Sequence, residues 1–463
     1  MKKVSVLALI VIIAVGGIVG YVNSFDKEQS EKLLAQANLT GEDQKVAKVL
    51  YDNGCQYCHS PNAELPFYAS VPVVSNMLEN DIEVGNRFFR LDRMISSLKD
   101  STKLSEADLA KLERVVINDE MPIAKFTALH WGSKLDDQEK QTLIDWIHNK
   151  RATFLPKDTE GTDVTRFVQP IPDKLDTDPS KVALGRKIYH DGRLSGDGSI
   201  QCHTCHQLKK GGVDGLPVSE GIFGQKGGIN APTVYNAAFN SWQFWDGRAK
   251  TLADQAGGPP LNPIEMGSKN WEEIIAKFEK DEEFKKEFLS VFPEISDKTL
   301  TAAIAEFEKT LITPNSAFDR YLKGDKEALT PAQKRGYEIF QSAKCDTCHT
   351  GIAMGGQSFE YMGLYGNYFE DRNKPLAAED DGRFSHTKDP SDKHKFKVPT
   401  LRNVALTAPY MHDATAKDLK EAVRIMAVYQ SGKSLSEQEI NDVVSFLESL
   451  TGELDGKLLT IEK

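Results

Sequence analysis

The sequence has no excess of basic residues and no basic tract. Its 57 Lys and Arg residues stand against 68 Asp and Glu residues, which gives a formal net charge of −11 at pH 7. Nucleic acids are bound largely through Lys and Arg contacts to phosphates, so this balance argues against a nucleic-acid partner. An acidic surface is compatible with a basic redox partner and equally with simple solubility.

The sequence also lacks the low hydrophobicity of a disordered chain. Hydrophobic residues make up 40% of its 463 positions, which is enough for a sizeable core. A single core rarely organises a chain of this length, so we expect roughly two to four domains.

A long stretch near the N-terminus carries no charge. It runs from Val4 to Val22, directly after Lys2 and Lys3. As a helix it would span about 28 Å, close to the thickness of the hydrocarbon core of a bilayer. The two lysines favour a cytoplasmic N-terminus with the remainder exported to the periplasm. We therefore expect a single-pass transmembrane anchor in the inner (cytoplasmic) membrane over residues 1–23.

Features of other export signals are missing from this segment. No cysteine lies near its end, which excludes a lipoprotein, and no clear A-x-A cleavage site follows it. A cleaved signal peptide remains the alternative, although the apolar segment is longer than usual for one. Gly16 and Gly20 form one small-xxx-small pair, which is a weak indication of a homodimer.

No cysteine lies outside one kind of motif. The six cysteines form three C-x-x-C-H sequences: Cys55-Gln-Tyr-Cys58-His59, Cys202-His-Thr-Cys205-His206 and Cys345-Asp-Thr-Cys348-His349. Two thiols three positions apart can form thioethers to the two vinyl groups of a haem, and the adjacent histidine then ligates the iron. Disulfides would not require the histidines, and neither would zinc sites made of paired C-x-x-C units. The motifs predict three covalently bound c-type haems with these histidines as proximal ligands.

The sequence around each motif repeats one plan. A helix is expected before each motif, at Val46–Tyr51, Gly185–Tyr189 and Gly336–Phe340. An amphipathic helix is expected after each, at Asp137–Arg151, Thr299–Leu311 and Ser436–Leu450, from apolar residues at three- and four-residue steps. This plan is typical of an all-α cytochrome c domain, so we expect three such domains after the N-terminal helix.

Composition suggests where the domains meet. Residues 24–40 are polar and are interpreted as a tether, and Pro156–Pro172 is rich in proline, threonine and charge and is interpreted as a linker. The predicted domains are an N-terminal cytochrome c domain (41–155), a second haem domain (173–323) and a third haem domain (324–463), with the linker at 156–172.

The sixth ligand of each iron decides whether a haem carries electrons or does chemistry. For the first haem we predict Met121, because Pro122 holds an extended backbone that can present the thioether. His130 is the alternative ligand, since both residue types are competent. Met121 would make the first haem an electron-transfer centre.

From Cys202 onward the chain resembles the bacterial di-haem cytochrome c peroxidase family. The resemblance extends from about residue 169 to residue 450. The residues that carry it are Asn230-Ala-Pro-Thr-Val-Tyr-Asn236, Gln243-Phe-Trp-Asp-Gly-Arg248, Ile264-Glu265-Met266, Leu401-Arg-Asn-Val404 and Thr407-Ala-Pro-Tyr410. With its additional N-terminal haem motif, the whole chain is similar to the tri-haem, membrane-anchored branch of that family.

The resemblance implies a role for each haem of the matching region. The Cys202 motif would hold the peroxidatic haem, and the Cys345 motif would hold an electron-transferring haem with Met426 as its second ligand. Met411 is the alternative for that ligand. The resemblance also implies Glu265 as the distal acid–base residue with Gln255 beside it, and Trp245 as a stepping point for electrons between the two haems.

A calcium site is implied in the same way. Asn230, with the backbone carbonyls of Thr407 and Pro409, would hold the ion between the two haems. Oxygen ligands of this kind suit a hard cation such as calcium.

One position departs from the family pattern. Many members have a histidine in the loop Ser219–Gly224 that occupies the peroxidatic iron until the enzyme is reduced, whereas this chain has Ile222. Because isoleucine cannot ligate iron, we expect an open peroxidatic site even in the fully oxidised protein. His190 and His203 are the other histidines near this motif, but they lie outside the expected loop.

The sequence therefore predicts a periplasmic peroxidase that reduces hydrogen peroxide. Electrons would pass from a donor through the His59/Met121 haem, the His349/Met426 haem and Trp245 to the haem on His206. The donor is left open among a quinol, a membrane or soluble cytochrome and a small copper protein. The alternatives are a pure electron-transfer cytochrome and an oxygenating relative like the di-haem enzymes that modify tryptophans in methylamine dehydrogenase. Those enzymes carry a tyrosine where Met426 is expected.

Overall fold

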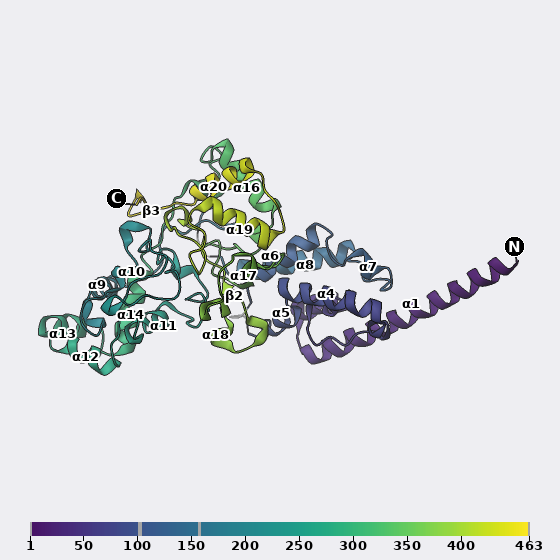
Figure 1. Ribbon diagram of the computed structural model, residues 1–463, viewed down its shortest axis with the longest axis horizontal. Coiled ribbons are helices and arrows are strands. Elements are labelled where there is room, and N and C mark those ends of the chain that lie inside the picture. The colour runs from purple at the N-terminus through teal and green to yellow at the C-terminus, as the bar shows by residue number, and fades with distance from the viewer. Residues whose placement is uncertain (1, 101–103, 156–158, 462–463) are drawn as a thin grey trace. The chain divides into compact units, whose positions relative to one another are not determined.

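The computed structural model describes residues 2–100, 104–155 and 159–461, with the side chains of residues 2–9 and 11 left out. The chain divides into two compact units, unit 1 (Met1–Phe154) and unit 2 (Leu155–Lys463), each of which is described by itself. Both are mostly helical, as the sequence predicts (Figure 1). The strands of the described residues are short antiparallel pairs, β1 (Phe359–Tyr361) with β2 (Lys395–Lys397) and β3 (Glu453–Leu454) with β4 (Lys457–Leu458).

Unit 1 is built from helices around one apolar core. Its helices are α1 (Lys2–Ala37), α2 (Gly41–Asp52), α3 (Gln56–His59), α4 (Pro72–Phe88), α5 (Leu91–Ser97), α6 (Glu106–Ile117), α7 (Ala124–Thr127) and α8 (Asp137–Ala152). The first turn of α8 is fixed by a capping box in which Asp136 and Glu139 each accept the backbone N–H of the other. This cap places the start of α8 at the predicted residue.

Helix α1 continues beyond the predicted anchor. The segment interpreted as a tether, residues 24–40, is helical as far as Ala37. The side chains at positions 1–9 and 11 of the predicted anchor lie outside the described residues. Within the described part of the chain, none of the helices combines the length and the apolarity that crossing a membrane requires.

Unit 2 contains two helix–motif–helix arrangements in succession. Its helices are α9 (Pro179–Tyr189), α10 (Cys202–Cys205), α11 (Leu252–Ala256), α12 (Trp271–Glu279), α13 (Glu282–Leu289), α14 (Asp297–Glu308), α15 (Ala317–Leu322), α16 (Pro331–Ser342), α17 (Tyr368–Asp371), α18 (Phe384–Thr387), α19 (Leu419–Ser431) and α20 (Glu437–Glu448). The predicted helices after the second and third motifs are confirmed as α14 and α20. Helix α14 begins two residues earlier than predicted because Ser296 caps it.

The two helix pairs of unit 2 cross in the same way. Gly185 of α9 lies so close to α14 that an added Cβ would stand 1.9 Å from the carbonyl oxygen of Ala303. Gly336 of α16 meets α20 with the same 1.9 Å approach to the carbonyl oxygen of Asp442. A glycine is required at each crossing because any side chain would separate the helices. The crossings hold the segments that carry the second and third motifs.

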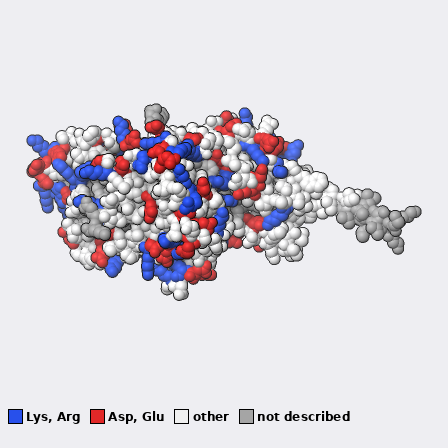
Figure 2. Space-filling view, turned by 90° about the horizontal axis from the view of Figure 1, so that it is seen from above, with Lys and Arg blue, Asp and Glu red and all other residues white. Residues whose placement is uncertain are grey.

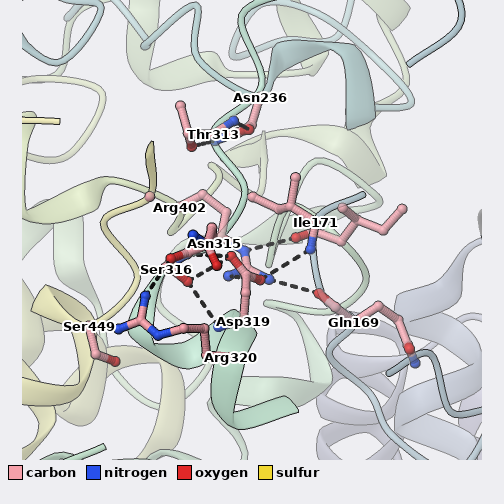
Figure 3. Close-up of polar contacts among 12 residues, drawn as sticks. Gln169, Ile171, Asn236, Thr313, Asn315, Ser316, Asp319, Arg320, Arg402 and Ser449 are labelled. Atoms are coloured by element: carbon pink, nitrogen blue, oxygen red, sulfur yellow. Dashed lines mark hydrogen bonds and ion pairs between the residues drawn. The ribbon is translucent and has the colours of Figure 1, made fainter. Parts of the chain in front are cut away.

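A buried ionic network joins segments that are distant in the sequence of unit 2 (Figure 3). Arg402 and Asp319 are both fully buried, with Nη1 and Oδ1 3.0 Å apart. Arg402 also donates to the carbonyls of Gln169 (2.7 Å) and Ile352 (2.9 Å), and the Ile171 N–H donates to Asp319 at 3.1 Å. The network therefore fastens the described end of the predicted linker to the loop that follows the third haem motif.

Candidate haem and peroxide site

The three C-x-x-C-H motifs share one local geometry. In each motif, the backbone N–H of the histidine donates to the backbone carbonyl of the first cysteine. The distances are 3.1 Å for His59, 3.0 Å for His206 and 3.0 Å for His349. This bond closes one helical turn and holds the two cysteines and the histidine of each motif together. Within the described residues, none of these six cysteines is joined to another in a disulfide. The motifs thus keep the groups that covalent haem attachment requires.

The motif histidines are held in the form that ligates a metal. Burial lowers the pKa of His59 and of His206, and it lowers the pKa of His349 to about 4, so the rings stay neutral at neutral pH. The Nδ1 of His59 lies 3.1 Å from the carbonyls of Gly85 and Phe89, and that of His349 lies 3.1 Å from the carbonyl of Met354. Among the described residues, no hydrogen bond engages the Nε2 of these rings. This arrangement fits haem iron as the missing partner.

His206 differs from the other two motif histidines. Its Nδ1 is buried and has no hydrogen-bond partner within the described residues. Its backbone is instead fixed by Tyr189 of α9, whose hydroxyl donates to the His206 carbonyl at 2.7 Å. The carbonyls of Gly212 and Pro232 nevertheless lie near enough to the His206 ring to oppose the fall in its pKa.

The two candidates for the sixth ligand of the first haem lie in different environments. The Nδ1 of His130 is 2.7 Å from Asp26, its Nε2 is 2.5 Å from the Tyr68 hydroxyl, and the residue is 1% exposed. Both ring nitrogens are therefore engaged by protein groups. Met121 is 40% exposed, and its thioether has no such engagement among the described residues. The arrangement favours Met121 over His130.

Met426 lies on α19 beside an aromatic cluster. It is half-buried against a core that contains Met362, Tyr368, Phe369 and Phe396. Met411, the alternative ligand, is half-buried against the same core and has a positive φ of 71°. The sulfur of Met362 accepts a hydrogen bond from the Gln430 amide at 3.3 Å. Met426 and Met411 thus both lie beside this aromatic core.

Glu265 and the loop that contains Ile222 are in direct contact. The Ile222 N–H donates to the Glu265 carbonyl at 2.9 Å, and Gly221 leaves no room for a Cβ against the backbone of Glu265. The Ile222 side chain is 2% exposed and packs beside Gly267. The loop position at which many family members are expected to carry a ligating histidine is therefore filled by a buried apolar side chain.

The carboxyl of Glu265 is half-buried and held by one amide. Asn262 Nδ2 donates to Glu265 Oε1 at 2.8 Å. Burial raises the pKa of Glu265, while the charge of Arg248 and the Asn262 hydrogen bond partly offset that rise. A raised pKa makes a carboxyl better suited to accept and then return a proton, which general acid–base chemistry requires.

Gln255 and Trp245 take separate positions. Gln255 is a half-buried residue of α11, and no hydrogen bond joins it to Glu265 in the described part of the chain. Trp245 Nε1 donates to the carbonyl of Asn230 at 2.9 Å, and its ring centroid lies 6.3 Å from those of Phe396 and His412. Trp245 therefore stands beside the core that also receives Met426.

The three residues expected to hold calcium retain suitable oxygens. The Asn230 N–H donates to the carbonyl of His412 at 2.8 Å, and its amide nitrogen donates to the carbonyl of Leu216 at 3.0 Å. This leaves the amide oxygen of Asn230 without a donor among the described residues. The carbonyls of Thr407 and Pro409 likewise accept no hydrogen bond from that part of the chain. Neutral oxygens of this kind fit a calcium ion.

Sequence reasoning missed a buried charged cluster behind Trp245. The Nε2 of His412 lies 2.7 Å from Asp380, and Arg372 contacts both Asp380 (2.5 Å) and Asp413 (2.7 Å). His412, Asp380 and Asp413 stand close enough to hold a metal ion, but Arg372 already supplies the positive charge. The family motif Thr407–Tyr410 ends two residues before His412. In the sequence, the only indication of this cluster was that His412 and Asp413 lie next to that motif.

The face of the molecule in Figure 2 has no large surface patch of one charge sign that would indicate a partner. Positive and negative side chains are interspersed there. A mixed surface of this kind does not identify a donor by charge.

Three family profiles match separate parts of the chain. They are "Haem-binding domain" over residues 14–149, "Di-haem cytochrome c peroxidase" over residues 179–327 and "Cytochrome c" over residues 333–451. Each of the three matched segments contains one C-x-x-C-H motif.

Similar proteins support the same grouping. The chain is 49% identical over 438 residues to the cytochrome c peroxidase of Escherichia coli (strain K12), a match that covers 94% of each chain. It is 44% identical over 276 residues to the cytochrome c551 peroxidase of Pseudomonas aeruginosa, covering 58% of this chain and 78% of that one.

Solved structures show the same architecture in part of the chain. A MauG-like protein associated with microbial copper homeostasis superposes with a TM-score of 0.54 at 31% identity, covering 65% of this chain and 95% of that one. The di-haem peroxidase BthA of Burkholderia thailandensis shares the fold at 19% identity with a TM-score of 0.52, covering 65% of this chain and 93% of that one.

Proposed function

Because the chain belongs to the di-haem cytochrome c peroxidase family, we propose that it is a haem peroxidase that reduces hydrogen peroxide to two waters. The observation that carries the proposal is the contact between Glu265 and the Ile222 loop. It supplies a proton-handling carboxyl next to a loop that lacks the ligating histidine. Bound at Cys202, Cys205 and His206, a haem supplies the iron at which peroxide accepts electrons.

Glu265 handles the proton in this proposal. Cleavage of the O–O bond requires a proton to move from the inner oxygen of peroxide to the outer one, which then leaves as water. Glu265 accepts the first proton and returns it to the outer oxygen. Asn262 orients the carboxyl through its 2.8 Å hydrogen bond, and Gln255 acts beside Glu265 as a polar neighbour of the substrate.

Ile222 keeps the peroxide site open in every oxidation state. Its side chain is apolar and buried, so this position of the loop has no group to offer an iron. The rings of His190 and His203 lie against each other at an angle of 55°, with centroids 4.6 Å apart. This pairing supports their exclusion as substitutes. The protein therefore reacts with peroxide without prior reduction.

Electrons reach this site through two further haems. The first is held by Cys55, Cys58, His59 and Met121, and the second by Cys345, Cys348, His349 and Met426. Trp245 completes the route to the peroxidatic haem. Its position against the core that receives Met426 supports this role. A calcium ion on Asn230, Thr407 and Pro409 stabilises the same region.

The proposed location is the periplasmic face of the inner membrane. The uncharged run Val4–Val22 supports an anchor, with Lys2 and Lys3 on the cytoplasmic side. Tyr21, near the end of that run, is 47% exposed, and its ring lies 5.2 Å from that of Phe67, which is 51% exposed. Aromatic residues of this kind are enriched at membrane interfaces. An anchored protein of this design can accept electrons from a membrane-borne donor.

The test is a spectrum of the fully oxidised protein followed by addition of hydrogen peroxide without reductant. We expect a high-spin component from one of three haems, and we expect peroxide to remove it rapidly. Three low-spin haems whose spectrum does not change on addition of peroxide would contradict an open peroxidatic site. Repeating the addition after one-electron reduction would then separate a peroxidase that needs activation from a pure electron carrier.

A further inference from the structure

Lys397 is a buried cation for which the described part of the chain supplies no partner. It ends strand β2, where it pairs with Phe359 of β1, and only 5% of the residue is exposed. No ion pair or hydrogen bond engages its Nζ within the described residues. Burial alone lowers the pKa of this ammonium to about 8.

Two other buried cations of unit 2, unlike Lys397, are paired with carboxylates. The side chain of Arg372 is 1% exposed and contacts Asp380 and Asp413, while Arg402 is fully buried against Asp319. A buried charge is costly unless an opposite charge compensates it. Among the residues that the structure describes, Lys397 therefore lacks the compensating carboxylate that both arginines have.

The position of Lys397 indicates where such an anion would come from. Its N–H donates to the carbonyl of Trp245 at 2.8 Å. The next residue, Val398, donates to Ser358 (3.0 Å) and accepts from Gly356 (2.7 Å), in the loop that follows His349. The carbonyl of Pro399 reaches the His349 ring and opposes the fall in its pKa. Strand β2 thus lies between Trp245 and the third haem motif.

We propose that the Nζ of Lys397 forms an ion pair with a propionate carboxylate of one of the two haems of unit 2. The inference rests on the proposed haem content of that unit. A propionate is a carboxylate at the edge of the porphyrin, and it supplies the negative charge that the site lacks. A fixed ammonium beside that edge stabilises the ferrous state, because reduction adds a negative charge to the haem. Lys397 is thereby a positioning residue whose positive charge raises the reduction potential of this haem.

The experiment compares the full-length holoprotein with Lys397→Met, Lys397→Gln and Lys397→Arg. The matched control is Lys393→Met, since Lys393 is a half-exposed lysine four positions earlier that lies 3.8 Å from Asp381. Midpoint potentials of all three haems are measured by spectroelectrochemistry. We expect one potential of unit 2 to fall in the methionine and glutamine variants, to recover in the arginine variant and to stay unchanged in the control. The haem that responds, peroxidatic or electron-transferring, identifies the propionate.

A second measurement separates a propionate contact from a general charge effect. Haem labelled with ¹³C at its propionate carboxylates is incorporated, and redox difference infrared spectra are recorded. We expect the labelled carboxylate bands to move in Lys397→Met or Lys397→Gln but not in Lys393→Met. Unchanged potentials and bands in a Lys397 variant that retains haem would overturn the proposal.

The haem content distinguishes the failure of this inference from failure of the proposed function. If unit 2 incorporates no haem, the peroxidase proposal fails first. If three haems are present and peroxide is reduced, but the Lys397 variants match the Lys393 control, the inference alone fails. The glutamine variant keeps the test open should the methionine variant not fold.

Discussion

The two haem regions of unit 2 share a scaffold but differ in what surrounds their haem motifs. In both, a glycine of the first helix meets a carbonyl of the last, as Gly185 meets Ala303 and Gly336 meets Asp442. One turn after Ala303 and Asp442, each of the last helices carries a phenylalanine, Phe307 in α14 and Phe446 in α20. The helix pair thus positions a haem motif without deciding its chemistry.

The loops and the later helices decide that chemistry. In the second region, Glu265 and Ile222 come from irregular segments that contact each other through backbone atoms. In the third region, Met426 comes from the regular helix α19 and packs against an aromatic core. A carboxyl suits proton transfer, while a thioether saturates iron and suits electron transfer. Under the proposed function, the two regions use one repeated helical frame for proton transfer and for electron transfer.

The change with the largest expected effect removes the carboxyl that distinguishes the second region. Glu265→Gln keeps the shape and the contact to Asn262 but cannot accept a proton. We expect kcat for hydrogen peroxide to fall by about 10²–10⁴-fold, the usual contribution of a general acid–base residue. Steady-state kinetics at saturating donor measure it. Glu220→Gln, an exposed acid of the neighbouring loop, is the control, and equal activity in both variants would contradict the role of Glu265.

The next change makes the third region less suited to accepting electrons. Met426→His replaces a thioether with a stronger donor, so we expect the potential of that haem to fall by a sizeable part of the roughly 0.8 V range that axial ligands cover. Spectroelectrochemistry measures the shift. The same substitution at Met411 is the control. A shift at Met411 with none at Met426 would reverse the assignment of the ligand.

The shared scaffold itself can be tested through its glycines. Gly185→Ala and Gly336→Ala each place a Cβ 1.9 Å from a carbonyl oxygen, so the helices must separate. We expect each to lower the free energy of unfolding by about 1–3 kcal/mol, the usual cost of overpacking. Gly257→Ala, whose Cβ would meet nothing nearer than 3.4 Å, should cost far less. Denaturant titration of the holoprotein makes the comparison, and equal costs at all three glycines would argue against the crossing.

The smallest expected effect concerns the pH dependence of the second region. Burial raises the pKa of Glu265, and Arg248 opposes that rise. The carboxylate needed to accept a proton forms only above this pKa, so activity is lost as the pH falls through it. In Arg248→Gln the pKa rises further, and we expect the acidic limb of kcat/KM to move to higher pH by up to about one unit. Lys226 is an exposed lysine just after the loop Ser219–Gly224, and Lys226→Gln should leave the acidic limb in place. An acidic limb that moves to lower pH in Arg248→Gln would contradict the assignment.

Local patterns made much of the architecture predictable. Residues at three- and four-residue steps predicted the helices observed as α8, α14 and α20, because one face of each must be buried. The motif spacing predicted three sites in which thiols and a histidine share one turn. Glu265 and Trp245 came from a family resemblance, since an acid beside Pro263 or a single tryptophan has no distinctive local pattern.

Other features depended on contacts between distant segments. Nothing local indicates that Arg372 lies between Asp380 and Asp413, or that His130 is engaged by Asp26 and Tyr68. Lys397 looks like an ordinary strand lysine in the sequence. Burial, which removes water from a charge, becomes visible only when the segments around it are assembled.

The sequence by itself determined the chemistry that this protein can hold. Three C-x-x-C-H motifs specify covalent attachment, because thioether formation and ligation need only residues within one turn. The tertiary structure alone decided which groups are desolvated and what they face. Ile222 is buried beside the backbone of Glu265, and the rings of His59 and His349 are neutral. Lys397 is buried with no partner for its ammonium among the described residues. The physical reason is that desolvation and ion pairing depend on the distances between segments far apart in the chain.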